Sequence, residues 1–265
     1  MTTTARLRAF LRRDLRLARS YRAAFLGQFL GIALFLATFG LMSSVVRNDF
    51  ASRFGSDYFA FAAVGIAVSG ALVAALTAFG GALREAQLDG TLEAVLTTPA
   101  PQEETVALLG AYPLLFGFVG GAVTLVGAAL FGANYDIDLL ALVLAAVLSI
   151  CAFAALGLLT AAGVLIAKRG NPVAGLLGMA GTVAAGAYVP ASTFPGWLQA
   201  VAAVNPMTYA LRAWRGALLE GRGPSSLAAP LLVLAVLTVV GLPVALTVLR
   251  RAIDLARAEG TLATY

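Results

Sequence analysis

The chain has 265 residues, of which 60% are hydrophobic and only 12% are charged. Soluble domains carry about 45–50% apolar and about 25% charged residues, so this composition leaves too little polar surface to face water. It excludes a soluble protein and favours a chain whose solvent is mostly lipid. The formal net charge of +5 does not indicate a nucleic-acid partner, because no polar fold is available to present it.

The N-terminal segment, residues 1–22, is predicted to be an amphipathic helix at the cytoplasmic membrane surface. Apolar side chains recur at helical spacing and arginines fill the other side. Such a helix lies in the headgroup layer, with its arginines toward anionic phosphates. Two readings remain open and are compatible: the helix only anchors the protein, or it also contacts a cytoplasmic partner.

Six apolar runs follow, each long enough to cross a bilayer. They are residues 23–46, 58–83, 105–133, 139–167, 172–189 and 227–249. The third and fourth runs are separated only by a short segment, so we expect a hairpin that turns at Asn134, Tyr135 and Asp136. The predicted fold is therefore an all-α integral membrane protein, in which residues 23–265 form one domain with six transmembrane helices.

Lysine and arginine are distributed unevenly between the connecting segments, and cytoplasmic loops carry the excess of these residues. With the N-terminus inside, the cytoplasmic segments hold most of the basic residues, and the second outer loop holds none. We therefore predict a multi-pass protein of the cell membrane, inner or plasma, with both termini cytoplasmic.

None of the six runs contains Asp, Glu, Lys or Arg, and the chain has no His. Ion-coupled carriers usually keep ionisable groups at membrane depth, so the pattern argues against such a carrier. No phosphate-binding G-x-x-x-x-G-K-[ST] motif is present, no His-dependent nucleophile set is possible, and no cluster of metal ligands exists. We predict a chain that is not an enzyme, binds no metal or cofactor, and receives its energy from elsewhere.

Residues 84–98 are predicted to form a short amphipathic helix on the cytoplasmic side, between the second and third runs. Glu85, Asp89 and Glu93 make an acidic stripe at successive steps of four residues, and Leu88 and Leu92 belong to the apolar face. An acidic stripe is poorly placed beside an anionic membrane surface. It favours a protein groove as its partner, although a solvated loop helix remains an alternative.

The outer segment 190–219, between the fifth and sixth runs, is long and rich in apolar and aromatic residues. The sequence predicts one short helix near Leu198–Val204, a break at Asn205–Pro206, and a second helix from Met207 to Leu219. Helices of this length are more typical of re-entrant or interfacial segments than of spans. Trp197, Tyr209 and Trp214 suit an interfacial aromatic belt, and a lid on a pathway is the other reading.

Small residues mark places where helices can approach closely in lipid. Three groups occur at helical spacing: Gly27 and Gly31, Gly117 and Gly121, and Gly175, Gly178 and Gly181. Such groups are common in transmembrane helices, so alone they indicate association between copies only weakly.

Three features together resemble the permease subunit of type-2 ABC exporters, including the G-subfamily fold. The first is the basic N-terminal helix followed by six spans. The second is Asp89-Gly90-Thr91-Leu92-Glu93 with Thr98-Pro99 soon after, similar to the family's cytoplasmic G-T-L-E…P loop. The third is the segment before the last span, with Phe194-Pro195, Trp197, Asn205-Pro206, Tyr209 and Arg212.

The resemblance implies two permease copies that pair with each other and with two separate ATP-binding cassette subunits, which hold the ATP and Mg²⁺. It implies that residues 84–98 form the coupling helix, with Glu85, Leu88, Asp89, Gly90, Thr91, Leu92 and Glu93 as the contact to the ATPase. It places the substrate pathway on spans two and five, at Ser69, Val73, Thr77, Gly178, Thr182 and Tyr188. It assigns the outer gate to Phe194, Trp197, Asn205, Pro206, Tyr209 and Arg212.

The substrate expected from spans two and five is a hydrophobic or amphiphilic compound, such as a drug, lipid or glycolipid. These spans consist mostly of Ala, Gly, Val and Leu, with aromatic residues near their ends, whereas polysaccharide-exporting relatives often carry aromatic residues along the path. A polysaccharide exporter and a non-transporting membrane scaffold remain the alternatives.

Overall fold

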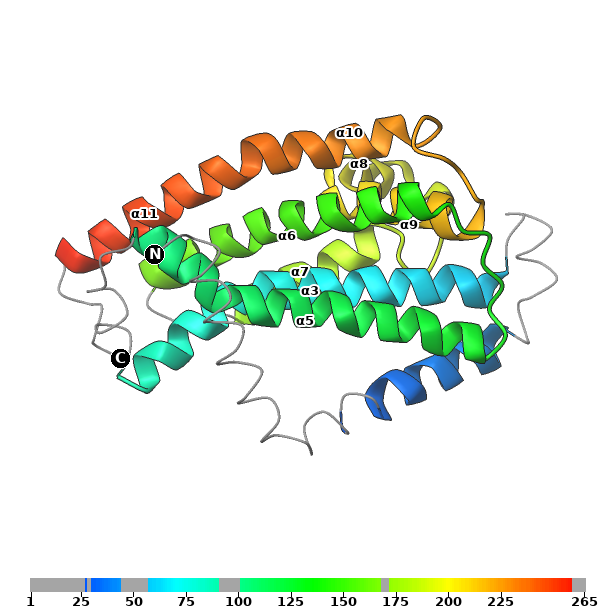
Figure 1. The fold of residues 1–265 in the computed structure, drawn as a ribbon, viewed down its shortest axis with the longest axis horizontal. Coiled ribbons are helices and arrows are strands. Elements are labelled where there is room, and N and C mark those ends of the chain that lie inside the picture. Colours follow the sequence, from blue (N-terminus) through cyan, green and yellow to red (C-terminus); the bar gives the residue numbers. More distant parts are fainter. Residues whose placement is uncertain (1–26, 28–29, 44–56, 91–100, 168–171, 259–265) are drawn as a thin grey trace.

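The computed structural model describes residue 27 and residues 30–43, 57–90, 101–167 and 172–258, and over these residues its regular structure is entirely helical. Within these residues, four helices are long and apolar enough to cross a membrane. They are α3 (Tyr58–Leu88), α5 (Gln102–Leu130), α6 (Leu139–Ala167) and one continuous helix made of α10 (Ala228–Val236), η2 (Leu237–Gly241) and α11 (Leu242–Ala258). Figure 1 shows them side by side as an elongated bundle.

Two shorter apolar helices account for the described parts of the first and fifth predicted spans. They are Leu30–Ser43 and α7 (Pro172–Ala184). The all-helical class of the described residues is therefore confirmed, and four of the predicted spans are helices long and apolar enough to cross a bilayer, while the count of six remains a prediction. The predicted N-terminal helix, residues 1–22, lies outside the described residues.

Helix α3 forms the centre of the bundle, because α5, α6, α7 and α9 (Pro206–Leu219) all pack against it. Small residues make these approaches possible. A Cβ atom at Gly117 of α5 would collide with Ala74, and one at Gly157 of α6 would collide with the Ala75 carbonyl. Gly117 and its neighbour Gly121 thus pack inside one chain, whereas Gly31 has no atom within 4 Å of the position of a Cβ.

The two ends of α3 are set by Asp57 and Gly90. The Asp57 carboxylate accepts a hydrogen bond from the Phe59 backbone N–H at 3.3 Å, which caps the first turn. The helix continues past the predicted end of the second span and stops at Leu88, followed by Gly90 at φ 65°. Residues 84–88 therefore extend α3 and do not begin a separate helix, which corrects the predicted helix 84–98; residues 91–98 lie outside the described part of the chain.

The hairpin between α5 and α6 turns where the sequence predicts it. The Tyr135 hydroxyl donates to the Leu125 carbonyl at 3.1 Å, and the Asp138 carboxylate accepts from the Ala141 N–H at 2.8 Å, capping α6. Burial raises the pKa of Tyr135 to about 12, so its hydroxyl stays protonated and keeps donating. These local bonds fix the two long helices as antiparallel neighbours.

Helix α7 ends earlier than the predicted fifth span, which was expected to reach residue 189. Gly186 has φ 78°, its N–H donates to the Val183 carbonyl, and the Ala187 N–H donates to the Thr182 carbonyl. This pair of bonds is a Schellman motif, in which a glycine with positive φ terminates a helix. The chain after Ala184 is therefore a turn, and α7 alone is too short to cross a bilayer.

The last helix contains a π-helical turn, η2, in the middle of the membrane-length segment. Pro243 follows it and has no N–H to donate to the preceding turn, which is a common cause of such a bulge. The Thr238 hydroxyl donates to the Leu234 carbonyl of its own helix at 2.9 Å and lies 3.4 Å from the Leu148 carbonyl of α6. The helix then continues beyond the predicted end at Leu249, to Ala258.

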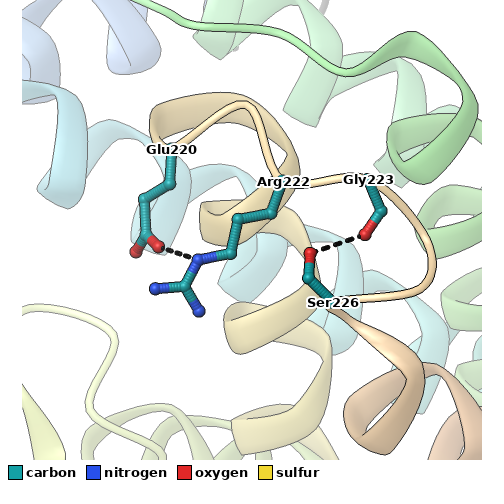
Figure 2. Close-up of polar contacts among 4 residues, drawn as sticks. All are labelled: Glu220, Arg222, Gly223 and Ser226. Atoms are coloured by element: carbon teal, nitrogen blue, oxygen red, sulfur yellow. Dashed lines mark hydrogen bonds and ion pairs between the residues drawn. The ribbon is translucent and has the colours of Figure 1, made fainter.

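The outer helices form at one end of the bundle as predicted, as α8 (Gly196–Val204) and α9, broken at Asn205. The connection from α9 to α10 is held by local contacts. Arg222 and Glu220 form an ion pair at 2.6 Å, and the Ser226 hydroxyl donates to the Gly223 carbonyl at 2.8 Å. Figure 2 shows both contacts. The Gly221 N–H donates to the Asp136 carbonyl, so this connection packs on the α5–α6 hairpin.

Candidate functional site

The end of α3 near Leu88 carries three of the residues assigned to ATPase coupling. Glu85 and Leu88 are exposed on the last turn, Asp89 is the C-cap, and the opposite side of that turn is buried through Leu83 and Ala86. The exposed fraction of Leu88 is 72%, which is high for an apolar residue at the end of a packed helix. Gly90 is described with them, whereas Thr91, Leu92 and Glu93 lie outside the described residues.

Four of the residues assigned to the pathway form two contacts between α3 and the segment made of α7 and the turn after it. A Cβ at Gly178 would lie 3.0 Å from a Val73 methyl, and the Tyr188 hydroxyl interacts with the Ser69 hydroxyl. Ser69 and Thr182 are buried. In this single chain, Val73 packs against Gly178 and Ser69 contacts Tyr188, so α3 and α7 are in direct contact at these positions.

The hydroxyls of the pathway residues are satisfied by their own helices. Ser69 donates to the Gly65 carbonyl, Thr77 to the Val73 carbonyl at 2.9 Å, and Thr182 to the Gly178 carbonyl at 2.8 Å. A hydroxyl bonded to its own helix presents little polarity to a neighbour. Thr77 and Thr182 therefore add little polarity to the α3–α7 surface, whereas the Ser69 hydroxyl also interacts with Tyr188.

The residues assigned to the outer gate hold the short helices to each other and to α7. Asn205 caps α9 by accepting from the Met207 N–H at 3.0 Å, and its amide donates to the Gly181 carbonyl of α7 at 2.7 Å. Pro206 occupies the first position of α9, where its missing N–H costs nothing. The Tyr209 hydroxyl donates to the Ala203 carbonyl of α8 at 2.7 Å.

The remaining gate residues lie nearer the surface. Trp197 is 70% exposed, as suits an interfacial aromatic residue. Phe194 follows the short 3₁₀ turn η1 (Ala191–Thr193), and its carbonyl accepts from the Gln199 amide at 2.8 Å. Arg212 is exposed, with its guanidinium 5.7 Å from the centre of the Tyr209 ring.

Arg215, which was not among the predicted site residues, makes the most extensive contacts of the outer helices. Its guanidinium donates to the Gly186 carbonyl at 3.0 Å and the Ala187 carbonyl at 2.7 Å, and lies 3.4 Å from the Phe61 carbonyl. It also stacks 3.4 Å from the centre of the Phe61 ring. The Gly186 and Ala187 carbonyls lie in the turn that follows α7, and the Phe61 carbonyl lies in the first turn of α3. A single cation therefore joins α9, the turn after α7 and the start of α3.

The sequence around Arg215 contains one indication that this residue is buried. It stands between Trp214 and Gly216, both buried, in a helix whose other arginine, Arg212, is exposed. An arginine between two residue types that often pack in the core is less typical of a solvated helix face than an arginine among polar residues. Its partners are backbone carbonyls, however, and these leave no trace in the sequence.

Trp214 corrects the predicted aromatic belt. It is only 8% exposed, and its indole N–H donates to the Ser149 hydroxyl of α6 at 3.2 Å. A buried indole needs a hydrogen-bond partner, and Ser149 supplies one within the bundle. Trp214 therefore fixes α9 against α6 and is not an exposed residue of the predicted aromatic belt.

The described helices carry no Asp, Glu, Lys or Arg within residues 58–83, 105–130, 139–166 or 228–249. Long apolar helices around a central helix, with two short helices at one end, define a multi-pass α-helical membrane protein. The chain matches the model of the family described as ABC-2 type transporter over residues 5–219. Because this match covers most of the chain, the protein belongs to the ABC-2 type transporter family, as its membrane permease domain.

The family assignment confirms the resemblance to a permease and places ATP hydrolysis on a partner, since ABC-2 permeases work with ATP-binding cassette subunits. The matched range ends with α9, so the last helix lies beyond it. A search of curated proteins found no match to the chain.

Proposed function

We propose that two copies of this chain form the transmembrane pathway of an ATP-driven exporter, powered by two ATP-binding cassette subunits. The observation that carries the proposal is the exposed Leu88, flanked by Glu85 and Asp89, at one end of the central helix. An exposed apolar side chain between two carboxylates suits a protein groove better than an anionic membrane surface.

Coupling through this end of α3 is physically direct. Leu83 and Ala86, one turn away, are buried against the bundle, so a force applied at Leu88 acts on a packed helix and not on a free loop. Thr91, Leu92 and Glu93 complete the proposed contact surface. ATP and Mg²⁺ belong to the partner subunits in this scheme, and this chain holds no cofactor.

The second copy is proposed to cover the outward face of α7 and the helix Leu30–Ser43. On α7 the exposed large apolar side chains are Leu176, Leu177, Met179 and Val183. The pathway residues Val73 and Gly178 lie immediately behind this face. Opening of the α3–α7 contact toward the partner copy would expose them to a substrate, while α8 and α9 would close the outer end.

The proposed substrate is a hydrophobic or amphiphilic compound, because the α3–α7 surface is apolar and its hydroxyls are bonded to their own helices. A polysaccharide is the second candidate, and the aromatic groups at Tyr188 and Phe39, whose ring centroids are 5.7 Å apart, are the observation in its favour. The proposed location is the cell membrane, with both termini cytoplasmic.

The test uses the permease co-expressed with its ATP-binding subunits and reconstituted in vesicles. Leu88→Asp and Glu93→Arg are expected to abolish ATP-dependent transport and reduce co-purification of the ATPase, because both disrupt the proposed groove contact. Glu220→Gln, at the opposite end of the bundle, is the control and should leave both unchanged. Full transport by Leu88→Asp and Glu93→Arg would disprove the coupling site, and bound ATPase without any transport would favour a scaffold.

A further inference from the structure

A charged cavity of about 420 Å³ lies between the start of α5 and the end of α11, at the end of the bundle opposite to α8 and α9. It is separate from the α3–α7 contact and from the outer helices. The residues that line it are Pro101, Gln102, Glu103, Arg250, Asp254 and Arg257.

The cavity combines both signs of charge in equal number. Arg250, Asp254 and Arg257 follow one another at steps of four and three residues, which places them on one side of α11. Glu103 comes from the first turn of α5. Two arginines and two carboxylates give a formal charge of zero, yet none of the four forms an ion pair within 4 Å with another residue that the structure describes.

The position of the cavity along the helices matches the level of lipid headgroups. The apolar run of the last helix ends at Leu249, directly before Arg250, and Val244 and Val248 are exposed below it. On the other side of the cavity, the apolar run of α5 begins at Thr105, two residues after Glu103. The cavity therefore opens where hydrocarbon gives way to the polar layer, which is about 5–8 Å thick on each side.

We propose that this cavity binds the headgroup of a phospholipid that carries both a phosphate and a primary ammonium, as in phosphatidylethanolamine. Arginine binds phosphate oxygens through paired N–H donors, and Glu103 and Asp254 accept hydrogen bonds from the ammonium. A net-zero lining suits a zwitterion. An anionic headgroup without an ammonium would leave the two carboxylates without a positive partner. A choline headgroup has no N–H to donate to them.

The experiment measures which lipid the full-length protein retains. The protein is reconstituted in nanodiscs that contain equal parts of phosphatidylethanolamine, phosphatidylglycerol and phosphatidylcholine, then released, and its bound lipids are quantified by native mass spectrometry. Phosphatidylethanolamine is expected to be enriched about tenfold over each of the others, the ratio that one charge-assisted hydrogen bond confers.

Two double variants test the recognition of the phosphate and of the ammonium separately. Arg250→Gln with Arg257→Gln should abolish the retention of phosphatidylethanolamine, whereas Glu103→Gln with Asp254→Asn should abolish only its preference over phosphatidylcholine. Arg251→Gln is the matched control, because Arg251 is exposed on the same turn but does not line the cavity. Unchanged helicity and thermal unfolding would show that each variant is folded.

Three results would overturn the proposal. Equal retention of all three lipids would exclude headgroup recognition. If Arg251→Gln lost as much phosphatidylethanolamine as the Arg250→Gln, Arg257→Gln double variant, the retention would be due to general surface charge. Displacement of the lipid by water-soluble glycerophosphoethanolamine at the same concentration would show that the cavity takes a soluble phosphodiester and not a membrane lipid.

Discussion

Replacement of Arg215 tests whether one buried contact holds the outer helices to the core of the bundle. Arg215→Met removes the guanidinium and keeps an unbranched, apolar stem of similar length. Two short charge-assisted hydrogen bonds are lost, to the Gly186 carbonyl at 3.0 Å and the Ala187 carbonyl at 2.7 Å, together with stacking on Phe61. Hydrogen bonds to charged groups contribute about 1.5–3 kcal/mol each, so the loss of two should lower the free energy of unfolding by about 3–6 kcal/mol.

Arg215→Lys should lie between the wild type and Arg215→Met. An ammonium keeps the positive charge at the end of α7, but it lacks the planar fork that reaches two carbonyls and stacks on a ring at once. Arg212→Met is the control on the same helix. Arg212 is exposed and only approaches the Tyr209 ring at 5.7 Å, so its loss should cost less than about 1 kcal/mol.

The assay is chemical unfolding of the purified protein in detergent, with limited proteolysis in the segment 186–195 as a second readout. Arg215→Met should unfold at lower denaturant concentration and be cleaved faster in this segment, because the turn after α7 loses its partner. If Arg212→Met and Arg215→Met were equally destabilising, or if neither changed the proteolysis rate, the assignment of Arg215 as the link between α7, α9 and α3 would be refuted.

Two further predictions concern the contacts of the central helix, both read from thermal unfolding in detergent. Gly117→Ala should destabilise the protein by about 1–3 kcal/mol, because the new Cβ collides with Ala74. Gly163→Ala is the control: it lies in open space on α6 and should be neutral or slightly stabilising. The reverse order of stabilities would contradict the packing of α5 on α3. Thr160→Val should lower the free energy of unfolding by about 0.5–2 kcal/mol, because the Thr160 hydroxyl donates to the Leu76 carbonyl of α3 at 2.6 Å. Thr247→Val is the control and should lower it less, because the Thr247 hydroxyl bonds only within α11.

The sequence predicted the elements whose signals are local. Runs of apolar residues located α3, α5, α6 and the last helix, and Asn205–Pro206 marked the break between α8 and α9, because proline and an N-cap asparagine act on their own neighbours. The hairpin at Tyr135 was predicted for the same reason. The second apolar run ends at residue 83, where charged residues begin, but charge does not end a helix, and α3 continues to Leu88.

The candidate site was less accessible from the sequence because it depends on contacts between distant segments. Apolarity alone extended the fifth span to Val189, while the Schellman turn at Gly186 ends α7 at Ala184. Trp214 is predicted from the sequence to lie in an interfacial aromatic belt, and Arg215 is not among the predicted site residues. The partner of Trp214 is Ser149, and the partners of Arg215 are three backbone carbonyls; all of them lie far away in the chain. Backbone partners carry no side-chain signature, so periodicity could not identify them.

Helix α3 has a mechanical consequence that follows from its length and its two ends. It is one uninterrupted helix of 31 residues, about 46 Å long at 1.5 Å per residue. One end presents Leu88 to the outside of the bundle, and the other supplies the Phe61 ring that stacks on Arg215. A tilt of about 5° about one end would displace the other by about 4 Å. A rod of this kind behaves as a lever, so that motion at one membrane surface reaches the outer helices without any intermediate joint.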